Sequence, residues 1–168
     1  MTGRVQRLFV SDVEQKPVHI ALLKEVVARG INLRVRVCGE SMYPFIRPGA
    51  TIIIKATQLQ DLVKGDLVLY YVQNRLVTHR VLGKKKSNAQ ITLLIKGDAV
   101  AYFDHPVQEH QIIGKVAALE KNGRVTRLDT LAQKVSNYII SRYSLLNPWL
   151  LPPLRLFKNA LRISLRKM

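Results

Sequence analysis

The stretch LRVRVCGESMYPFIRPGATIIIK, residues 33–55, decides which fold class the chain belongs to. Residues 33–37 alternate Leu or Val with Arg, which is typical of a β-strand with one face in water. Residues 38–50 are rich in Gly and Pro and predict a loop. The run TIIIK at 51–55 has the continuous apolar character of a buried strand. The segment therefore predicts two strands joined by a loop, within a β-domain.

Further strands are predicted downstream, separated by polar turns. Gln73-Asn74 indicates one hairpin, the Asn-Gly pair at 122–123 indicates another, and residues 84–88 predict a basic turn. The strands are expected at residues 66–72, 75–82, 91–96, 112–119 and 124–128. Because few helices lie among them, the predicted fold class is mainly β: a partly closed antiparallel β-domain with one short N-terminal helix and C-terminal amphipathic helices.

Helical periodicity occurs only near the two ends of the chain. Residues 17–29 carry apolar side chains at helical spacing between Pro17 and Gly30, which favour a helix start and a helix end. After Asp129 the helical period returns and runs, with an apolar kink at 149–153, to the last residue. We therefore divide the chain into an N-terminal segment with a short helix (1–32), a β-domain (33–128) and a basic amphipathic helical tail (129–168).

The 168-residue chain is strongly basic, with 27 Lys and Arg, 11 Asp and Glu, and a formal net charge of +16. Residues 121–168 alone hold ten basic residues and one acidic residue. A basic amphipathic helix preceded by Trp149 is typical of peripheral membrane contact, and docking of this helix on the β-domain is the alternative. The absence of a helix-turn-helix in front of the β-domain makes nucleic acid an unexpected partner.

Other features limit the site chemistry and the location. The single cysteine excludes an internal disulfide and a zinc site of several thiolates, and we expect no cofactor and no metal. No apolar run approaches the length of a membrane span, and the first twenty residues lack the pattern of a secretory signal. These features predict a cytoplasmic protein or one that is peripheral on the inner membrane face.

Ser41 and His79 are the candidate nucleophile and general base. Ser41 lies in the Gly- and Pro-rich loop, where it could equally be a turn residue, and a serine hydroxyl needs a base to act as a nucleophile. His79 lies within a predicted strand, on the same face as Val77 and Val81. A histidine on an apolar strand face is more often a structural residue than a catalyst, so neither residue is decisive by itself.

The order of five short segments changes this assessment. GESMYPFIRPGATIIIK, GDLVLYYV, VTHRVLG, IKGDAVAYFDHP and IIGKV follow one another with short spacers. Over residues 33–120 this order resembles the signal peptidase I clan of serine peptidases, which includes leader peptidases and self-cleaving SOS-type repressors. Many members use a lysine base, and His79 stands at that position here. The chain is thereby most similar to the Ser-His branch of the endoplasmic reticulum and the archaea, with a repressor-like Gly-Glu-Ser-Met box.

The resemblance implies a serine endopeptidase that cleaves a leader or signal-like peptide. Ser41 would be the nucleophile and His79 the general base. Asp104 is favoured to orient the imidazole and Asp98 to support the serine side of the site, although sequence alone does not separate the two carboxylates. The substrate would carry small residues before the cut. Suggested pocket walls are Met42, Phe45, Ile52 and Val77.

The chain also departs from the family pattern. Many relatives carry Ser or Thr two residues before the nucleophile as an oxyanion donor, and Gly39 stands there instead. The N-terminal span of most signal peptidases and a repressor's self-cleavage site in a separate N-terminal arm are not seen. Two alternatives therefore stay open: a non-catalytic β-module that binds membrane or a partner through its basic tail, and a regulator related to the repressors.

Overall fold

The computed structural model describes residues 6–7, 17–87, 90–121, 123–130, 136 and 138–140. Within these residues the fold is mainly antiparallel β with few helices, as the sequence predicts. The strands are β1 (Gln6–Arg7), β2 (Leu33–Arg36), β3 (Thr51–Lys55), β4 (Leu67–Val72), β5 (Arg75–Ser87), β6 (Gln90–Lys96), β7 (Val107–Gln108), β8 (Ile112–Lys121) and β9 (Arg124–Arg127). The helices are α1 (Pro17–Ala28) and two 3-10 turns, η1 (Leu59–Asp61) and η2 (Glu109–Gln111).

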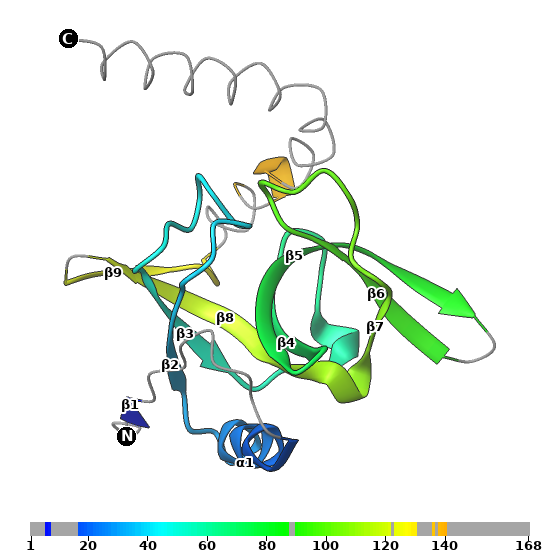
Figure 1. Ribbon diagram of the computed structural model, residues 1–168, viewed down its shortest axis with the longest axis horizontal. Coiled ribbons are helices and arrows are strands. Elements are labelled where there is room, and N and C mark those ends of the chain that lie inside the picture. The colour runs from blue at the N-terminus through cyan, green and yellow to red at the C-terminus, as the bar shows by residue number, and fades with distance from the viewer. Residues whose placement is uncertain are drawn as a thin grey trace, which may run out of the picture.

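The strands form one curved sheet in the order β1-β2-β3-β8-β4-β5-β6-β7, and β9 pairs with β8 (Figure 1). The pairing of β1 with β2 is parallel, and the other pairings are antiparallel. Because β8 pairs with both β3 and β4, it connects the half of the sheet that carries β2 to the half that carries β5. This central strand therefore decides how the loop after β2 meets β5.

Close packing at β8 explains the Gly in its Ile-Gly-Lys-Val motif. A Cβ on Gly114 would lie 2.5 Å from the backbone oxygen of Lys55 and 2.7 Å from the Ile54 side chain, closer than packed atoms tolerate. The next residue, Lys115, pairs with the buried carboxylate of Asp66 at 2.7 Å. The Ile-Gly-Lys-Val motif therefore lies where β8 packs against β3 and against the start of β4.

Helix α1 belongs to the same hydrophobic core as the first half of the sheet. It buries Ile20, Leu23 and Val27 in a cluster with residues of β2, β3, β4 and β8, while Gly30 closes it at a φ of +79°. A left-handed conformation is costly for other residues, which explains the glycine at the helix end. A second cluster lies on the far side of the β4–β5 pair and includes Val68, Tyr70 and Ile95.

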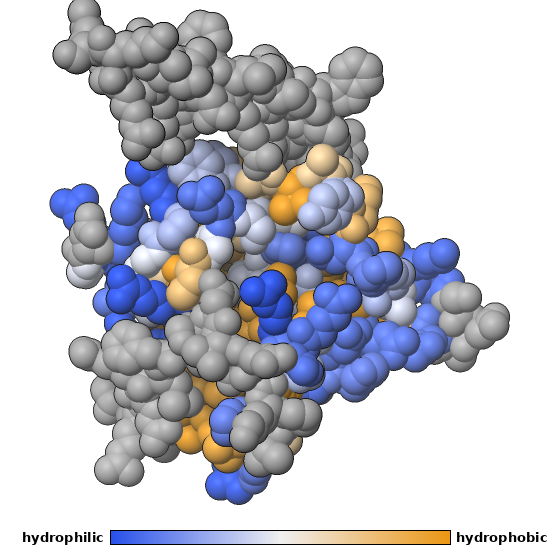
Figure 2. Space-filling view, in the orientation of Figure 1, coloured by the Kyte–Doolittle hydropathy of each residue, from blue (hydrophilic) through white to orange (hydrophobic). Residues whose placement is uncertain are grey.

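The two strands β5 and β6 form an arm that extends from the body of the molecule (Figure 1). The sequence predicts a basic turn at 84–88, but Lys84, Lys85 and Lys86 continue β5 as exposed strand residues. Their pairing with β6 from Ile91 to Leu93 satisfies the backbone, which the local charge pattern does not reveal. Figure 2 shows hydrophilic surface over this arm. A separate turn at Gln73-Asn74 joins β4 to β5. Both of its residues have a positive φ, 47° and 59°, as a tight hairpin turn requires.

The predicted C-terminal amphipathic helices lie largely outside the described residues. Of the tail, Ser136 and residues 138–140 are helical, and the Lys64 ammonium lies 5.6 Å from the ring centre of Tyr138. In the part of the chain that the structure covers, no helix has the length and apolarity to cross a membrane. The role predicted for the tail in membrane contact stays a prediction.

Candidate active site

The loop between β2 and β3 presents Ser41 beside a cleft. Met42 and Ile46 on either side of its tip are 2% and 1% exposed and fix the loop to the core. Two backbone hydrogen bonds close its turns: Tyr43 N–H donates to the Glu40 carbonyl at 2.9 Å, and Ile46 N–H donates to Met42 at 2.9 Å. Ser41 is half-buried, so its hydroxyl lies on a rigid turn and remains within reach of the cleft.

His79 on β5 faces Ser41. Its Nε2 lies 2.9 Å from the Ser41 Oγ, and its Nδ1 lies 2.5 Å from Oδ2 of Asp104. The imidazole is 8% exposed and the Asp104 carboxylate 20% exposed. With Nδ1–H donating to the carboxylate, Nε2 is left as the acceptor for the serine hydroxyl, which is the arrangement of a general base beside a nucleophile.

The segment after β6 carries Asp104 into position. Asp104 N–H donates to the Ile95 carbonyl at 3.0 Å, and Ala99 N–H donates to the Ser41 carbonyl at 2.8 Å. The same segment therefore holds both the acid and the backbone of the serine. Tyr70, which is buried on β4, places its hydroxyl 3.3 Å from Nδ1 of His79. Burial raises the pKa of the Tyr70 phenol, and the nearby Asp104 carboxylate adds to the rise, so this hydroxyl stays protonated.

Asp98 lies apart from the three aligned residues. Its two carboxylate oxygens accept hydrogen bonds from Nε and Nη2 of Arg80 at 2.8 and 2.7 Å, and both side chains are 1% exposed. Arg80 also donates through Nη1 to the Gly65 carbonyl at 3.0 Å. Since Arg80 follows His79 and Asp98 precedes Ala99, this ion pair joins the two segments that carry the site.

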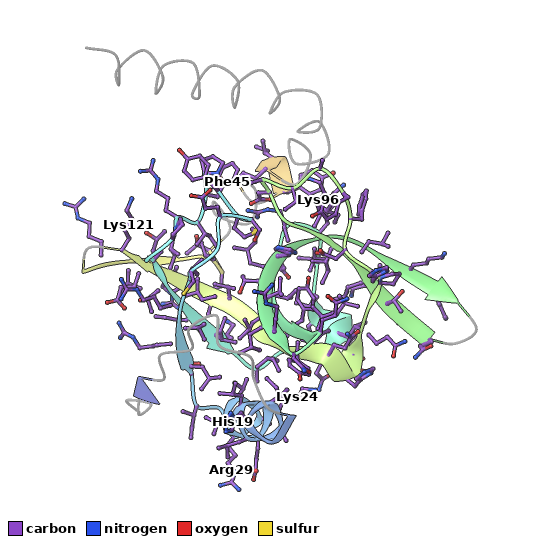
Figure 3. All side chains as sticks on the ribbon, in the orientation of Figure 1. His19, Lys24, Arg29, Phe45, Lys96 and Lys121 are labelled. Carbon is purple, nitrogen blue, oxygen red and sulfur yellow. The ribbon has the colours of Figure 1, made fainter. Side chains whose placement is uncertain are left out.

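Two buried residues near the site were not singled out from the sequence: Arg80 and Lys96. Both stand in predicted strands with apolar neighbours, VTHRVL at 77–82 and ITLLIK at 91–96, but charged residues are seldom buried, so the sequence pattern did not favour their burial. Lys96 is 1% exposed and its Nζ lies 3.3 Å from the Gly97 carbonyl. Burial lowers the pKa of Lys96, and the carboxylates of Asp98 and Asp104 oppose this effect. Figure 3 shows Lys96 and Phe45 at one end of the molecule, opposite α1.

A cleft of about 290 Å³ opens beside Ser41, between the segment that leads into the loop and the first residues of β5. Of the suggested walls, Met42, Ile52 and Val77 line it. Phe45 does not, because its exposed ring instead covers the Arg80 guanidinium, whose Cζ is 5.7 Å from the ring centre. The remaining lining residues are Val35, Arg36, Val37, Cys38, Gly39, Ser41, Leu69, Arg75, Leu76 and Thr78.

Gly97 permits the close approach of the site segments. A Cβ there would lie 2.8 Å from the Ser41 carbonyl oxygen and 3.0 Å from Nε2 of His79. Replacing Gly97 with alanine is therefore expected to displace the serine or the imidazole and to lower the reactivity of the Ser41 hydroxyl by about 100-fold, as misplacements near 1 Å do. The rate at which a serine-directed fluorophosphonate labels Ser41 would measure the loss.

The matched control is Gly83→Ala on β5. Its added methyl would meet only the Leu94 side chain at 3.8 Å, an ordinary contact, so a labelling rate within about twofold of the parent is expected. Equal labelling rates in the two alanine variants would contradict the role given to Gly97.

Among the described residues, no group of three or more His, Cys, Asp or Glu side chains is arranged to hold a metal ion.

Comparison with known proteins identifies the family. No curated protein matches the chain. The family model described as Peptidase S24-like matches residues 3–117, which span both Ser41 and Asp104. The chain therefore belongs to the Peptidase S24-like family.

Proposed function

We propose that the protein is a serine endopeptidase of signal-peptidase type, in which Ser41 is the nucleophile, His79 the general base and Asp104 its orienting acid. The observation that carries this proposal is the continuous chain of contacts from Ser41 Oγ to His79 Nε2 and from His79 Nδ1 to Asp104. The family match supports a serine-peptidase type of protein. The use of histidine in place of lysine is inferred from the contacts.

The steps follow from this arrangement. Ser41 Oγ attacks the scissile carbonyl while its proton passes to His79 Nε2, and the protonated imidazole is stabilised by Asp104. The tetrahedral intermediate collapses as the C–N bond breaks, and His79 returns the proton to the leaving amine. Water then attacks the acyl-enzyme with His79 again as base, which releases the acid and restores Ser41. Backbone N–H groups of the loop are proposed to stabilise the oxyanion in place of a side chain at Gly39.

The substrate is proposed to be a leader or signal-like peptide, bound in extended form. Among the described residues, pairing of β5 with β6 begins at Arg80, and pairing of β2 with β1 is limited to Leu33 and Arg34. The cleft between residues 35–39 and 75–78 therefore adjoins strand edges that can pair with an added peptide strand. The modest volume of the cleft and the apolar side chains of Met42, Ile52 and Val77 in its lining favour small side chains next to the scissile bond.

The proposal predicts that Ser41→Ala abolishes cleavage. The purified full-length chain and the variant would be incubated with a library of leader-like peptides, and the products would be read by mass spectrometry. We expect cuts after small residues by the parent and a loss of at least about 1,000-fold in rate for the variant, because no other group supplies the attacking oxygen.

Thr126→Ala is the matched control, since it removes a hydroxyl from an exposed position on β9, and it should cleave like the parent. A parent that cuts no peptide while folded would contradict the proposal and favour a non-catalytic β-module. Cleavage confined to the protein's own chain would instead favour a repressor-like regulator.

A further inference from the structure

Two arginines are among the residues that line the substrate cleft. Arg75 begins β5 and Arg36 ends β2, and both are exposed and line the cavity beside Ser41. Carboxylates pair with other arginines of the described residues: Arg29 with Glu25, Arg34 with Glu120, and Arg80 with Asp98. No carboxylate of the described residues forms an ion pair with Arg36 or Arg75. Within the part of the chain that the structure describes, the cleft thus carries positive charge that no ion pair neutralises.

The position of Arg75 on β5 indicates how far its positive charge lies from the scissile bond. Arg75 lines the cleft and lies four residues before His79 on the same strand, which corresponds to about 13 Å along the strand at 3.3 Å per residue. The Arg36 guanidinium is turned toward Gly49, 3.9 Å from the position that a Cβ there would take. Because Arg36 is turned toward Gly49, we take Arg75 as the recognition element along the cleft, and Arg36 adds to the positive field of the lining.

We propose that Arg75 selects substrates with a Glu or Asp at the third to fifth residue from the scissile bond, within the part of the peptide that the cleft holds. This inference rests on the proposed peptidase function and specifies its substrate class. A guanidinium donates paired hydrogen bonds to a carboxylate, and the partly enclosed cleft strengthens this contact relative to open surface. The formal net charge of +16 attracts an acidic peptide before it docks.

The test uses peptides that are cleaved by the parent and differ only in having Glu, Gln or Lys at these positions. We expect kcat/KM for the Glu peptide to exceed that for the Lys peptide about tenfold at low salt, with Gln between them, and the difference to shrink in 1 M NaCl. Arg75→Glu should reverse the order, and Arg75→Lys should retain part of it. Arg124→Glu makes the same charge change on β9, outside the cleft, and should preserve the order.

Measuring peptide affinity without cleavage tests this inference independently of the peptidase proposal. The Kd of each peptide for the Ser41→Ala variant, measured by fluorescence anisotropy, should follow the same order whether or not any peptide is cut. Tighter binding of the Glu peptide that is lost with Arg75→Glu supports the inference even if cleavage fails. Equal affinity and equal cleavage of the Glu and Lys peptides, or a preference that Arg124→Glu alters as strongly as Arg75→Glu, would overturn it.

Discussion

Replacing His79 with glutamine is expected to lower kcat/KM by about 1,000- to 10,000-fold while leaving the fold intact. Glutamine fills similar space and keeps a hydrogen bond within reach of Ser41, but it cannot take the serine proton. Asp104→Asn should cause a loss of similar size, because an amide next to Nδ1 no longer selects the tautomer that leaves Nε2 as the acceptor. Steady-state cleavage of the best peptide, with circular dichroism to check folding, would measure both losses.

The pair of variants also tests whether the residues act as one unit. If His79 acts through Asp104, the double variant should be little slower than His79→Gln alone, because the second change removes nothing further. Losses that multiply would indicate independent roles. Retention of most activity in His79→Gln would contradict the assignment of His79 as base and turn attention to buried Lys96.

The largest effect on stability is expected from Asp98→Ala, at about 3–5 kcal/mol of the free energy of unfolding. This change leaves the Arg80 guanidinium buried without its carboxylate, and an uncompensated buried charge is costly. Urea unfolding followed by circular dichroism would measure the loss. The double change Arg80→Met with Asp98→Leu should recover most of the stability, because it removes the charge as well as its partner.

Asp129→Ala is the contrasting control. Asp129 pairs with Lys55 at 3.5 Å and is 27% exposed, so solvent screens the pair and a loss below about 1 kcal/mol is expected. A loss at Asp98 no larger than that at Asp129 would show that the buried pair contributes no special stability. Cleavage that falls together with stability in Asp98→Ala would agree with a role in holding the segment that contacts Ser41.

The strands could be predicted because their signals are local. Alternation at 33–37, the apolar run at 51–55 and the hairpin turn at Gln73-Asn74 depend on neighbours within a few residues, and β2, β3, β4 and β5 were found close to their expected positions. The two-residue strands β1 and β7 could not be predicted, since two residues carry no period. The length of β5 through Lys84–Lys86 was also missed, because its partner β6 supplies the reason for the strand.

Only the tertiary structure shows that Asp104 contacts His79 while Asp98 pairs with Arg80. Both follow the Lys-Gly pair within one short segment, and nothing local distinguishes them. Pairing of Arg80 opposite Lys96 in the β5–β6 ladder puts the guanidinium beside Asp98, while the turn that follows returns Asp104 to the imidazole. The burial of Arg80 and Lys96 and the exclusion of Phe45 from the cleft arise in the same way, from contacts between segments.

The sequence by itself determined the mainly β fold, the place of the nucleophile loop between two strands, and the choice of Ser41 and His79 as residues to examine. Those features follow from periodicity and the order of short motifs. Only the tertiary structure decided that Ser41, His79 and Asp104 are in contact while Asp98 pairs with Arg80. The reason is physical: hydrogen bonds and ion pairs between residues 18 to 38 positions apart depend on strand register and loop closure, which packing of the whole sheet fixes.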